Sequence, residues 1–245
     1  MKNILFGIIL LGITFLYAHG PNHNLAEEAK KRGDYKSALK HTLKQLEEDL
    51  NTFGKNAKET IISYSKAGYY AEKIGKYQEA LEYNFKALRV QKKVSKKNDK
   101  TIAKTYNNIG GIYSKLKQYE DALEYYFKSL HIQKIIFGDN HRTAAITYNN
   151  IAGVYRKQKK YNKALEYYTK SLEIREETLG NDHYSTALSH SNIGLIYLQQ
   201  KKYQKALDEL EKTLTVQEKM FGKDHSFTKK TRRNILYVKK KMTIK

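Results

Sequence analysis

The chain has 245 residues with no cysteine and a single proline, and 46 lysine and arginine residues against 25 aspartate and glutamate residues give it a net charge of +21. The absence of cysteine excludes disulfide bonds, a thiol nucleophile, a cysteine-ligated metal and a lipidated N-terminal cysteine. The excess of positive charge predicts attraction to anions. An AT-rich genome would raise the lysine content through codon usage, but it would raise glutamate as well and does not explain the imbalance alone.

The first twenty residues have the layout of a secretory signal peptide. Lys2 precedes an apolar run over residues 4–17, and the small residues Ala18 and Gly20 follow. We therefore expect residues 1–20 to be cleaved, which would leave a net charge of +20 and a secreted or periplasmic chain. The alternative is an uncleaved membrane anchor, although the apolar run is shorter than the roughly 20 residues that a spanning helix needs.

Beyond this segment the sequence repeats with a period of 42 residues. A tyrosine recurs at this interval, and an Ala-Leu pair follows three and four residues after each one. The tyrosines are Tyr35, Tyr77, Tyr119, Tyr161 and Tyr203. A fixed period of this length is typical of a solenoid, whose units bury their apolar faces on one another. The predicted array spans residues 21–226, with units at about 21–54, 55–96, 97–138, 139–180 and 181–222.

The unit at residues 139–180 indicates what each repeat encodes. Tyr148, Ile151 and Tyr155 fall on one stripe of an amphipathic helix. A second stripe of the same kind begins at Tyr161 after a short polar stretch. Each unit is therefore predicted to be two helices joined by a turn, which makes the fold all-α.

Glycine and other small residues set the expected boundaries and contacts of these helices. Gly138, Gly180 and Gly222 each follow a second helix, where a left-handed C-cap favours glycine. The Asp, Asn, Thr and Ser residues that come next are expected to cap the following first helix. A small residue recurs inside the first helices, where it predicts close approach of two backbones. These residues are Gly68, Gly110, Ala152 and Gly194.

Both ends of the array are predicted to be atypical, as the terminal units of solenoids commonly are. The first helix of the first unit can start only around His23 and is short. Residues 227–245 are expected to form a basic capping helix and tail, because nine basic residues and one acidic residue lie between Gly222 and Lys245. A solvated closing helix is the first interpretation of this segment, and contact with an anionic surface is the second.

The order of an aromatic residue, Ile-Gly or Ile-Ala and Tyr, followed by Tyr-x-x-Ala-Leu, resembles the tetratricopeptide repeat. The 42-residue spacing, with Tyr-Asn-Asn-Ile and Glu-Tyr-Tyr, resembles its kinesin-light-chain-type variant. The resemblance implies a right-handed α-α superhelical solenoid of about five helix-turn-helix repeats with a C-terminal capping helix. HEAT-type repeats share the length range but do not predict the small residues found here. The proline that often follows the loop histidine in this variant is replaced by Arg142, Tyr184 and Ser226.

The resemblance also implies a concave groove lined by the first helices, where a peptide binds. The implied peptide-binding residues are Asn107, Asn149, Ser191, Lys115, Arg156, Lys157 and Gln199. Stacked amides can bond a peptide backbone, since each offers two donors and one acceptor. The second asparagine of each pair is expected instead to bond the backbone of the neighbouring repeat. These residues are Asn108, Asn150 and Asn192.

No catalytic, metal-binding or cofactor-binding motif is found in the sequence. His141, His183 and His225 recur at the period, so we expect them to cap or pack the loops between repeats. No histidine pair has the helical spacing of a zinc site, and nucleotide-binding motifs are absent. We predict a non-enzymatic interaction scaffold that binds an acidic peptide or partner protein and no nucleic acid. The alternatives are association with an anionic envelope surface of lipid, lipopolysaccharide or wall polymer, and a sensory repeat module of a signalling system.

Overall fold

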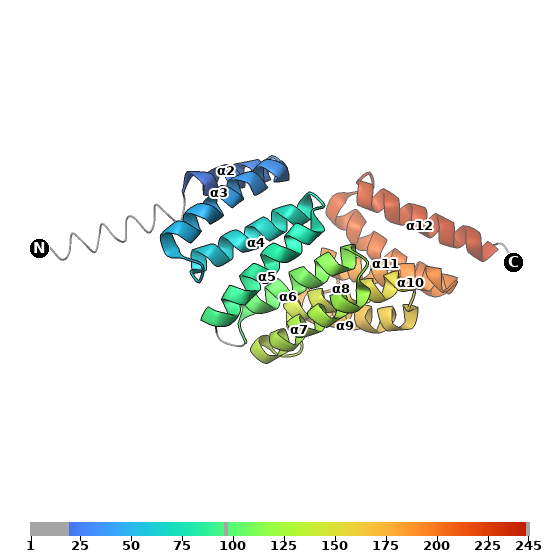
Figure 1. Cartoon of the computed structure of the whole chain (residues 1–245). Helices are drawn as coiled ribbons and strands as arrows, with labels where there is room; N and C mark the ends of the chain where they lie inside the picture. Colours follow the sequence, from blue (N-terminus) through green and yellow to red (C-terminus); the bar gives the residue numbers. More distant parts are fainter. Residues whose placement is uncertain (1–19, 96–97, 244–245) are drawn as a thin grey trace, which may run out of the picture. The chain divides into compact units, whose positions relative to one another are not determined.

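The computed structural model describes residues 20–95 and 98–243, and over these residues the chain forms eleven α-helices and no strand (Figure 1). The helices are α2 (Pro21–Lys31), α3 (Tyr35–Phe53), α4 (Lys58–Lys73), α5 (Tyr77–Val94), α6 (Lys100–Lys115), α7 (Tyr119–Phe137), α8 (Arg142–Lys157), α9 (Tyr161–Leu179), α10 (Tyr184–Gln199), α11 (Tyr203–Phe221) and α12 (Ser226–Thr243). The all-α prediction is confirmed. The predicted signal peptide lies outside the described residues except for Gly20, and none of the described helices is long and apolar enough to cross a membrane.

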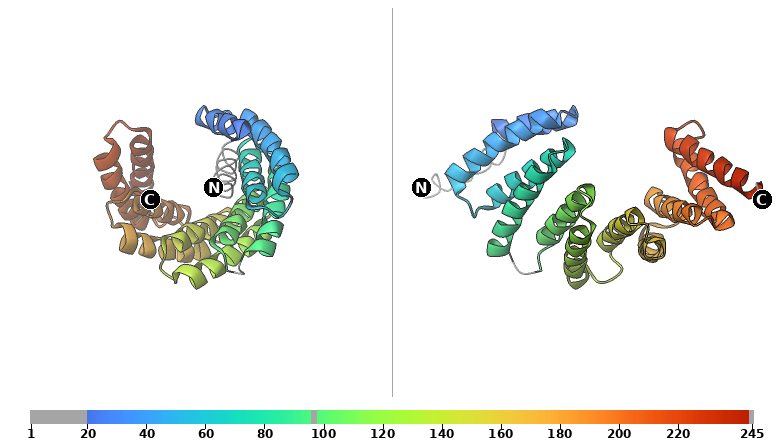
Figure 2. Two further views of the ribbon diagram at one scale, coloured as in Figure 1. Left: turned by 90° about the vertical axis from the view of Figure 1, so that its left-hand side faces the viewer. Right: turned by 45° about the vertical axis from the view of Figure 1, so that its right-hand side comes forward.

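The chain divides into two compact parts, an N-terminal part that ends at Gln118 and a C-terminal part that begins at Tyr119. In the N-terminal part each helix from α2 to α6 packs against the next one in the sequence, and the same holds from α7 to α12 in the C-terminal part. Successive helices lie side by side within each part in both views of Figure 2. This packing of consecutive helices confirms the predicted array of helical repeats.

Each second helix begins at one of the periodic tyrosines, from Tyr35 in α3 to Tyr203 in α11. The alanine three residues later is fully buried in every repeat. These alanines are Ala38, Ala80, Ala122, Ala164 and Ala206, each with no exposed surface. The tyrosine period therefore corresponds to the start of a helix, and the alanine period to a contact that excludes larger side chains.

The small residues of the first helices face the second helix of the same hairpin. A Cβ atom added to Gly68 would lie 2.4 Å from Asn84 Nδ2, and one added to Gly194 would lie 3.1 Å from Leu210 Cγ and 3.3 Å from the carbonyl oxygen of Ala206. Glycine in a helix interior is destabilising by about 1 kcal/mol relative to alanine. Here it allows close packing of the two helices, as predicted.

The loops between repeats differ from the prediction in two details. Gly180 and Gly222 adopt positive φ angles, but their ψ angles of 169° and 172° are extended rather than left-handed helical, a region that only glycine readily occupies. The predicted Asp, Asn, Thr and Ser caps are wrong for α8 and α10. The cap is a histidine in both, because Nδ1 of His141 and His183 accepts a hydrogen bond from the backbone N–H two residues later.

His225 makes the same contact with the N–H of Phe227 at the start of α12, so the predicted loop role of the three histidines is confirmed. Two of the histidine rings also stack on the last residue of the preceding helix. The ring centroids of Phe137 and His141 are 4.4 Å apart, and those of Phe221 and His225 are 4.7 Å apart. A neutral Nδ1 is required for this capping, since a protonated imidazole has no acceptor.

A buried polar position recurs near the end of every second helix, which the sequence analysis did not identify. It is occupied by Asp49, Gln91, Gln133, Arg175 and Gln217, all at most 9% exposed. Several of these side chains bond a hydroxyl on the first helix of the next repeat. Ser63 donates to Asp49 at 2.5 Å, Thr147 donates to Gln133 at 3.0 Å, and Arg175 donates to Ser189 at 2.8 Å. We call this set of residues the polar seam.

Candidate functional site

The predicted groove residues Asn149 and Ser191 lie half-buried on the first helices α8 and α10 of the C-terminal part. A hydrogen bond from Asn192 Nδ2 to Asn149 Oδ1, 3.0 Å long, joins these two helices. Asn192 thus bonds the neighbouring repeat as predicted, but through a side chain rather than the backbone. One acceptor of Asn149 is occupied within the protein, while its side chain keeps part of its surface accessible.

In the N-terminal part, Asn107 is half-buried on α6 and Lys115 is exposed in the last turn of the same helix. The Lys115 ammonium lies 2.7 Å from Glu72 Oε1 and 5.7 Å from the ring centre of Tyr77. Its charge is therefore partly neutralised by the protein itself. This makes Lys115 a weaker candidate for a partner's carboxylate than its position in the sequence indicated.

The remaining predicted residues lie at the ends of first helices in the C-terminal part. Arg156 and Lys157 lie in the last turn of α8, and Gln199 is the exposed last residue of α10. The carbonyl groups at a helix C-terminus favour nearby cations, so Arg156 and Lys157 are electrostatically well placed in α8. Both cations immediately precede the turn that leads to α9.

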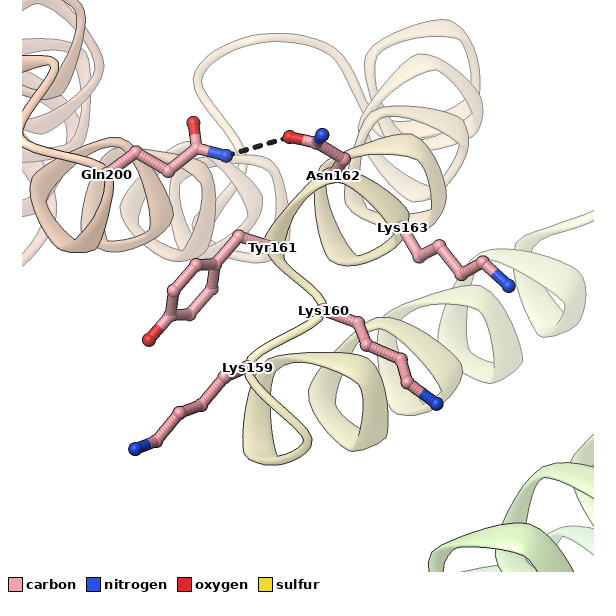
Figure 3. A pocket seen from close by; sticks show the side chains of 6 residues that line it. All are labelled: Lys159, Lys160, Tyr161, Asn162, Lys163 and Gln200. Atoms are coloured by element: carbon pink, nitrogen blue, oxygen red, sulfur yellow. Dashed lines mark hydrogen bonds between the residues drawn. The ribbon is translucent and has the colours of Figure 1, made fainter.

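An open hollow of about 380 Å³ lies at this turn between α8 and α9 (Figure 3). It is lined by Lys159, Lys160, Tyr161, Asn162, Lys163 and Gln200, and we call it the lysine hollow. Gln200 Nε2 donates a 2.9 Å hydrogen bond to Asn162 Oδ1, which ties the end of α10 to the first turn of α9. Figure 3 shows Lys160 and Lys163 pointing to one side of the turn, while Lys159 points to the other side beside Tyr161.

The backbone at this turn is one that favours glycine rather than lysine. Lys159 has a φ angle of 59°, its N–H bonds the carbonyl of Arg156, and the N–H of Lys160 bonds the carbonyl of Tyr155. This pair of bonds is the Schellman arrangement, whose left-handed residue is usually glycine. The first two repeats have Gly33 and Gly75 at the equivalent position, with φ angles of 75° and 80°.

The N-cap of the next helix also differs between repeats. Asp34 caps α3 by accepting a 3.0 Å hydrogen bond from the N–H of Ser37. Lys160 occupies the equivalent position before α9 and provides no side-chain cap. A cation there also faces the positive end of the helix dipole. Lys159 and Lys160 are therefore both less favourable for folding than the Gly-Asp pair of the first repeat.

The sequence contained a signal for this hollow that a comparison at the 42-residue period would have found. The left-handed residue and the N-cap residue change in step along the array. The pairs are Gly33-Asp34, Gly75-Lys76, Lys117-Gln118, Lys159-Lys160 and Lys201-Lys202. Positive charge at this turn thus increases from the first repeat toward the fourth and fifth repeats.

A buried histidine in the C-terminal part, His190, lies close to two carboxylates. His190 Nδ1 lies 2.6 Å from Glu209 Oε2, and its Nε2 lies 3.5 Å from Glu176 Oε1. Burial acts to raise the pKa of Glu209, but the hydrogen bond with His190 and the ammonium of Lys212 hold it below its ordinary value. The contact joins α10 to α11 inside a hairpin. Over the part of the chain that the structure describes, no group of three or more His, Asp or Glu residues is arranged to hold a metal ion.

The fold and this surface define a helical-repeat protein built from two-helix hairpins. More specifically, residues 101–177 and 143–219 match the family model described as tetratricopeptide repeat, so this stretch of the chain consists of tetratricopeptide repeats. The two matched segments overlap by one hairpin, in agreement with the period found in the sequence. No curated protein sequence matches the chain.

Solved structures of repeat proteins are similar to this chain in fold. The nearly identical repeats of a kinesin light chain from Podosopora anserina have 19% identity and a TM-score of 0.70, covering 82% of this chain and 95% of that one. BtubC from P. vanneervenii has 18% identity and a TM-score of 0.69, covering 91% and 85%. The apo form of RapI has 27% identity and a TM-score of 0.65, covering 74% of this chain and 64% of that one. These similarities confirm the predicted kinesin-light-chain-like repeat fold.

Proposed function

We propose that this protein is a non-enzymatic scaffold that binds an acidic segment of a partner protein on the α8 and α10 surface next to the lysine hollow. Tetratricopeptide repeat proteins are generally non-enzymatic interaction scaffolds, and this class suggests a protein partner. The proposal adds the acidic character of the partner and the place where it binds. Asn149, Ser191, Arg156, Lys157 and Gln199 would contribute polar and cationic contacts beside the hollow.

The observation that carries the proposal is the presence of Lys159 and Lys160 at two positions where lysine is unfavourable for folding. A left-handed conformation costs a non-glycine residue about 1–2 kcal/mol. A missing N-cap costs a further 0.5–2 kcal/mol or so. Because Gly33 and Asp34 satisfy both positions in the first repeat, folding alone does not favour the two lysines.

Charge and shape make an acidic polypeptide the partner that this surface fits best. Lys159, Lys160 and Lys163 line an open hollow, and the exposed Arg156 precedes it in the sequence. Oriented N–H groups at the start of α9 add partial positive charge. A carboxylate bound there would supply the acceptor that the N-cap residue does not provide.

The proposal is tested with a labelled acidic peptide and a peptide of equal length in which Asn and Gln replace Asp and Glu. Fluorescence anisotropy measures their binding to the wild type and to the double variant Lys159→Gly, Lys160→Asp, which recreates the turn of the first repeat. Each exposed ion pair contributes up to about 1 kcal/mol, so loss of two pairs should weaken binding of the acidic peptide by up to about thirtyfold. Because the variant should also be more stable, unfolding would not explain the loss.

The matched control is the double variant Lys205→Asn, Lys223→Asp, which makes the same change in net charge elsewhere on the C-terminal part. Its binding should stay close to that of the wild type. Binding of the acidic peptide should also weaken with salt, as the Debye length falls from about 10 Å at 0.1 M to about 3 Å at 1 M. Equal binding of both peptides, or equal loss in both double variants, would contradict an acidic partner at the lysine hollow.

The asparagine contacts are tested separately with Asn149→Ala and Asn192→Ala. If Asn149 binds a partner, its replacement should weaken peptide binding while the helical circular dichroism is unchanged, whereas Asn192→Ala should affect binding less. If the bond between Asn192 and Asn149 only joins two repeats, both variants should lose the same small amount of stability and bind the peptide as the wild type does.

The proposed location is secreted or periplasmic, on the basis of the predicted signal peptide at residues 1–20. Expression of the full chain with detection of the mature N-terminus by mass spectrometry tests this. An N-terminus near residue 18 or 20 in an extracytoplasmic fraction would support the proposal. An intact Met1 in a membrane fraction would favour the anchored alternative.

A further inference from the structure

Helix α12 closes the C-terminal part with two faces of different character. On its inner face, Ile235 and Val238 pack on a core cluster with Ala206, Leu207 and Leu210 of α11. On its outer side, the large apolar residues Leu236 and Tyr237 are 66% and 51% exposed. Leu236 is the most exposed large apolar side chain among the described residues. The inner face fixes the orientation of the helix, so these two side chains are held toward solvent.

Comparison with the preceding first helices shows that this outer face is not suited to another hairpin. Leu236 lies 42 residues after Gly194, at the position that is Gly or Ala in the earlier first helices. Even a Cβ atom at Gly194 would lie 3.3 Å from the backbone oxygen of Ala206 on its own second helix. A second helix placed against α12 in the same way would collide with Leu236. The exposed face therefore fits a different kind of partner.

The charge of α12 is entirely positive. The helix has seven lysine and arginine residues and no acidic residue. Lys229, Arg232 and Lys239 form ion pairs with Asp224, Glu218 and Glu211, and the Lys241 ammonium lies 5.6 Å from the ring centre of Tyr237. The other three cations have no counter-ion among the described residues. They are Lys230, Arg233 and Lys240.

These three cations and the exposed apolar side chains share one face of the helix. The stripe begins at Lys230 and continues with Arg233, Tyr237 and Lys240, which follow it by three, seven and ten residues. Residues at this spacing lie on one side of an α-helix. Leu236 lies beside the stripe. A row of unpaired cations around exposed Leu and Tyr side chains is the pattern of helices that lie in the surface of an anionic bilayer.

We propose that the outward face of α12 docks on an anionic phospholipid bilayer. Lys230, Arg233 and Lys240 contact lipid phosphates, while Leu236 and the ring of Tyr237 enter the interface below them. Long basic side chains can place their charged ends at the phosphate level while their aliphatic stems cover apolar surface. Tyrosine suits the same boundary because its ring is apolar and its hydroxyl is polar. The helix thus combines the electrostatic and apolar contributions that surface binding needs.

The first test is co-flotation with vesicles of equal parts phosphatidylglycerol and phosphatidylcholine, compared with vesicles of phosphatidylcholine alone. The wild type should float with the anionic vesicles only. The triple variant Lys230→Glu, Arg233→Glu, Lys240→Glu should bind at least about a hundredfold more weakly. Each cation near an anionic surface strengthens binding roughly fivefold, and three of them are lost. The control triple variant Lys202→Glu, Lys205→Glu, Lys223→Glu makes the same change in net charge outside α12. It should retain most of the binding.

The second test reports on insertion of the helix face. The chain has no tryptophan, so Tyr237→Trp introduces a single emission probe on α12. Its emission should shift to the blue with anionic vesicles and not with poly-glutamate in solution. Phe127→Trp, at a 38% exposed position on α7, should not shift with either. Leu236→Ser should reduce vesicle binding without a change in circular dichroism, because most of this side chain is already exposed to solvent.

Several results would overturn the proposal. These are absence of vesicle binding by the wild type, equal loss in the two triple variants, and an unshifted Tyr237→Trp emission on bound vesicles. Binding of poly-glutamate through α12 that exceeds vesicle binding would assign the face to an acidic polypeptide instead. The outcome is independent of the lysine hollow, because Lys159→Gly, Lys160→Asp leaves α12 unchanged and should float as the wild type does.

Discussion

Arg175 of α9 donates from one guanidinium nitrogen to the Ser189 hydroxyl of α10 at 2.8 Å and to the Ser185 carbonyl oxygen at 2.9 Å, and both Arg175 and Ser189 are buried. This contact joins the fourth repeat to the fifth. The equivalent residues in the preceding repeat are Gln133 and Thr147, which form a neutral pair. Arg175 thus places a charge at the position of the polar seam where Gln91, Gln133 and Gln217 place an amide.

We expect Arg175→Gln to be neutral or stabilising by up to about 1 kcal/mol, because it keeps a donor for Ser189 and removes a buried charge. Burial lowers the pKa of the Arg175 guanidinium, which indicates the same unfavourable desolvation. Arg175→Ala should instead lower the free energy of unfolding by about 1–3 kcal/mol, because it leaves the hydroxyl and carbonyl unsatisfied. Urea unfolding of the two variants checks this. Equal destabilisation in both would show that the charge itself stabilises the seam.

The left-handed turn residues give a second prediction. Lys159→Gly should raise the free energy of unfolding by about 0.5–1 kcal/mol, because glycine tolerates a positive φ but loses more entropy on folding. Gly75→Ala should lower it by about 1 kcal/mol for the same reason. An added Cβ atom at Gly75 meets nothing within 4 Å, so the effect there is conformational only. Thermal unfolding is the measurement, and a shift of the same sign in both variants would contradict the prediction.

The N-cap of α9 gives a third prediction. Lys160→Asp should stabilise the protein by about 0.5–2 kcal/mol, as a carboxylate there can accept from a first-turn N–H and favours the positive helix end. Asp34 makes this contact in α3, which provides the structural precedent. Lys160→Ala removes the charge without supplying a cap and should change stability less. If the alanine variant gained as much as the aspartate variant, relief of charge repulsion rather than capping would be the cause.

A fourth prediction compares two glycines of the first helices, one that packs closely against its second helix and one that does not. Gly68→Ala should be destabilising by about 1–3 kcal/mol, because the new Cβ would lie 2.4 Å from the amide nitrogen of buried Asn84, which is held by a 2.8 Å bond to Ala80. Gly153→Ala should be stabilising by about 1 kcal/mol, since its Cβ would meet only the Tyr168 hydroxyl at 3.8 Å. Chemical denaturation measures the free energy of unfolding of both variants. A gain in stability for Gly68→Ala, as for Gly153→Ala, would show that helix propensity outweighs packing at this position.

Acid stability gives a fifth prediction through Glu27. A hydrogen bond from Lys66 on α4, opposed by burial and aided by Lys30, lowers the pKa of Glu27 from 4.5 to about 2. Lys66 Nζ lies 2.7 Å from Glu27 Oε1, so the pair joins α2 to α4. Because the folded pKa is depressed, this contribution to stability is present above pH 4.5 and is lost as the pH falls toward 2.

Glu27→Gln should therefore melt at a lower temperature than the wild type at neutral pH. The difference between the two should shrink between pH 4.5 and 2, because the wild-type carboxylate becomes protonated there. Melting curves recorded across this range measure it. A difference that stays constant down to pH 2 would show that the ion pair does not contribute.

The periodic features of the sequence predicted the periodic features of the fold. Every second helix begins at its tyrosine, and the alanines and glycines sit where two helices touch, because local helix geometry and close packing act on the same residues in each repeat. The histidines were expected to cap or pack the loops, and both roles are found, in place of the Asp, Asn, Thr and Ser caps expected for α8 and α10. Aspartate and serine are commoner N-caps, so the sequence favoured them.

The candidate site was less predictable. Lys115 forms an ion pair with Glu72, and Asn149 accepts a hydrogen bond from Asn192. The sequence analysis had selected both residues as contacts for a bound peptide. The lysine hollow and the polar seam were missed because the sequence analysis followed the apolar stripes and did not compare these polar residues at the 42-residue period. Their significance lies in backbone φ angles and in partners 14 or 38 residues away, which stripe patterns do not report.

The sequence by itself therefore determined the repeat, its length and the apolar contacts, since these depend on periodicity and side-chain size. Only the tertiary structure decided which polar groups are paired within the protein and which remain for a partner. Hydrogen bonds and ion pairs require specific distances between side chains from separate helices. A lysine that is neutralised by a neighbouring carboxylate and one that is left exposed on α12 are the same letter in the sequence.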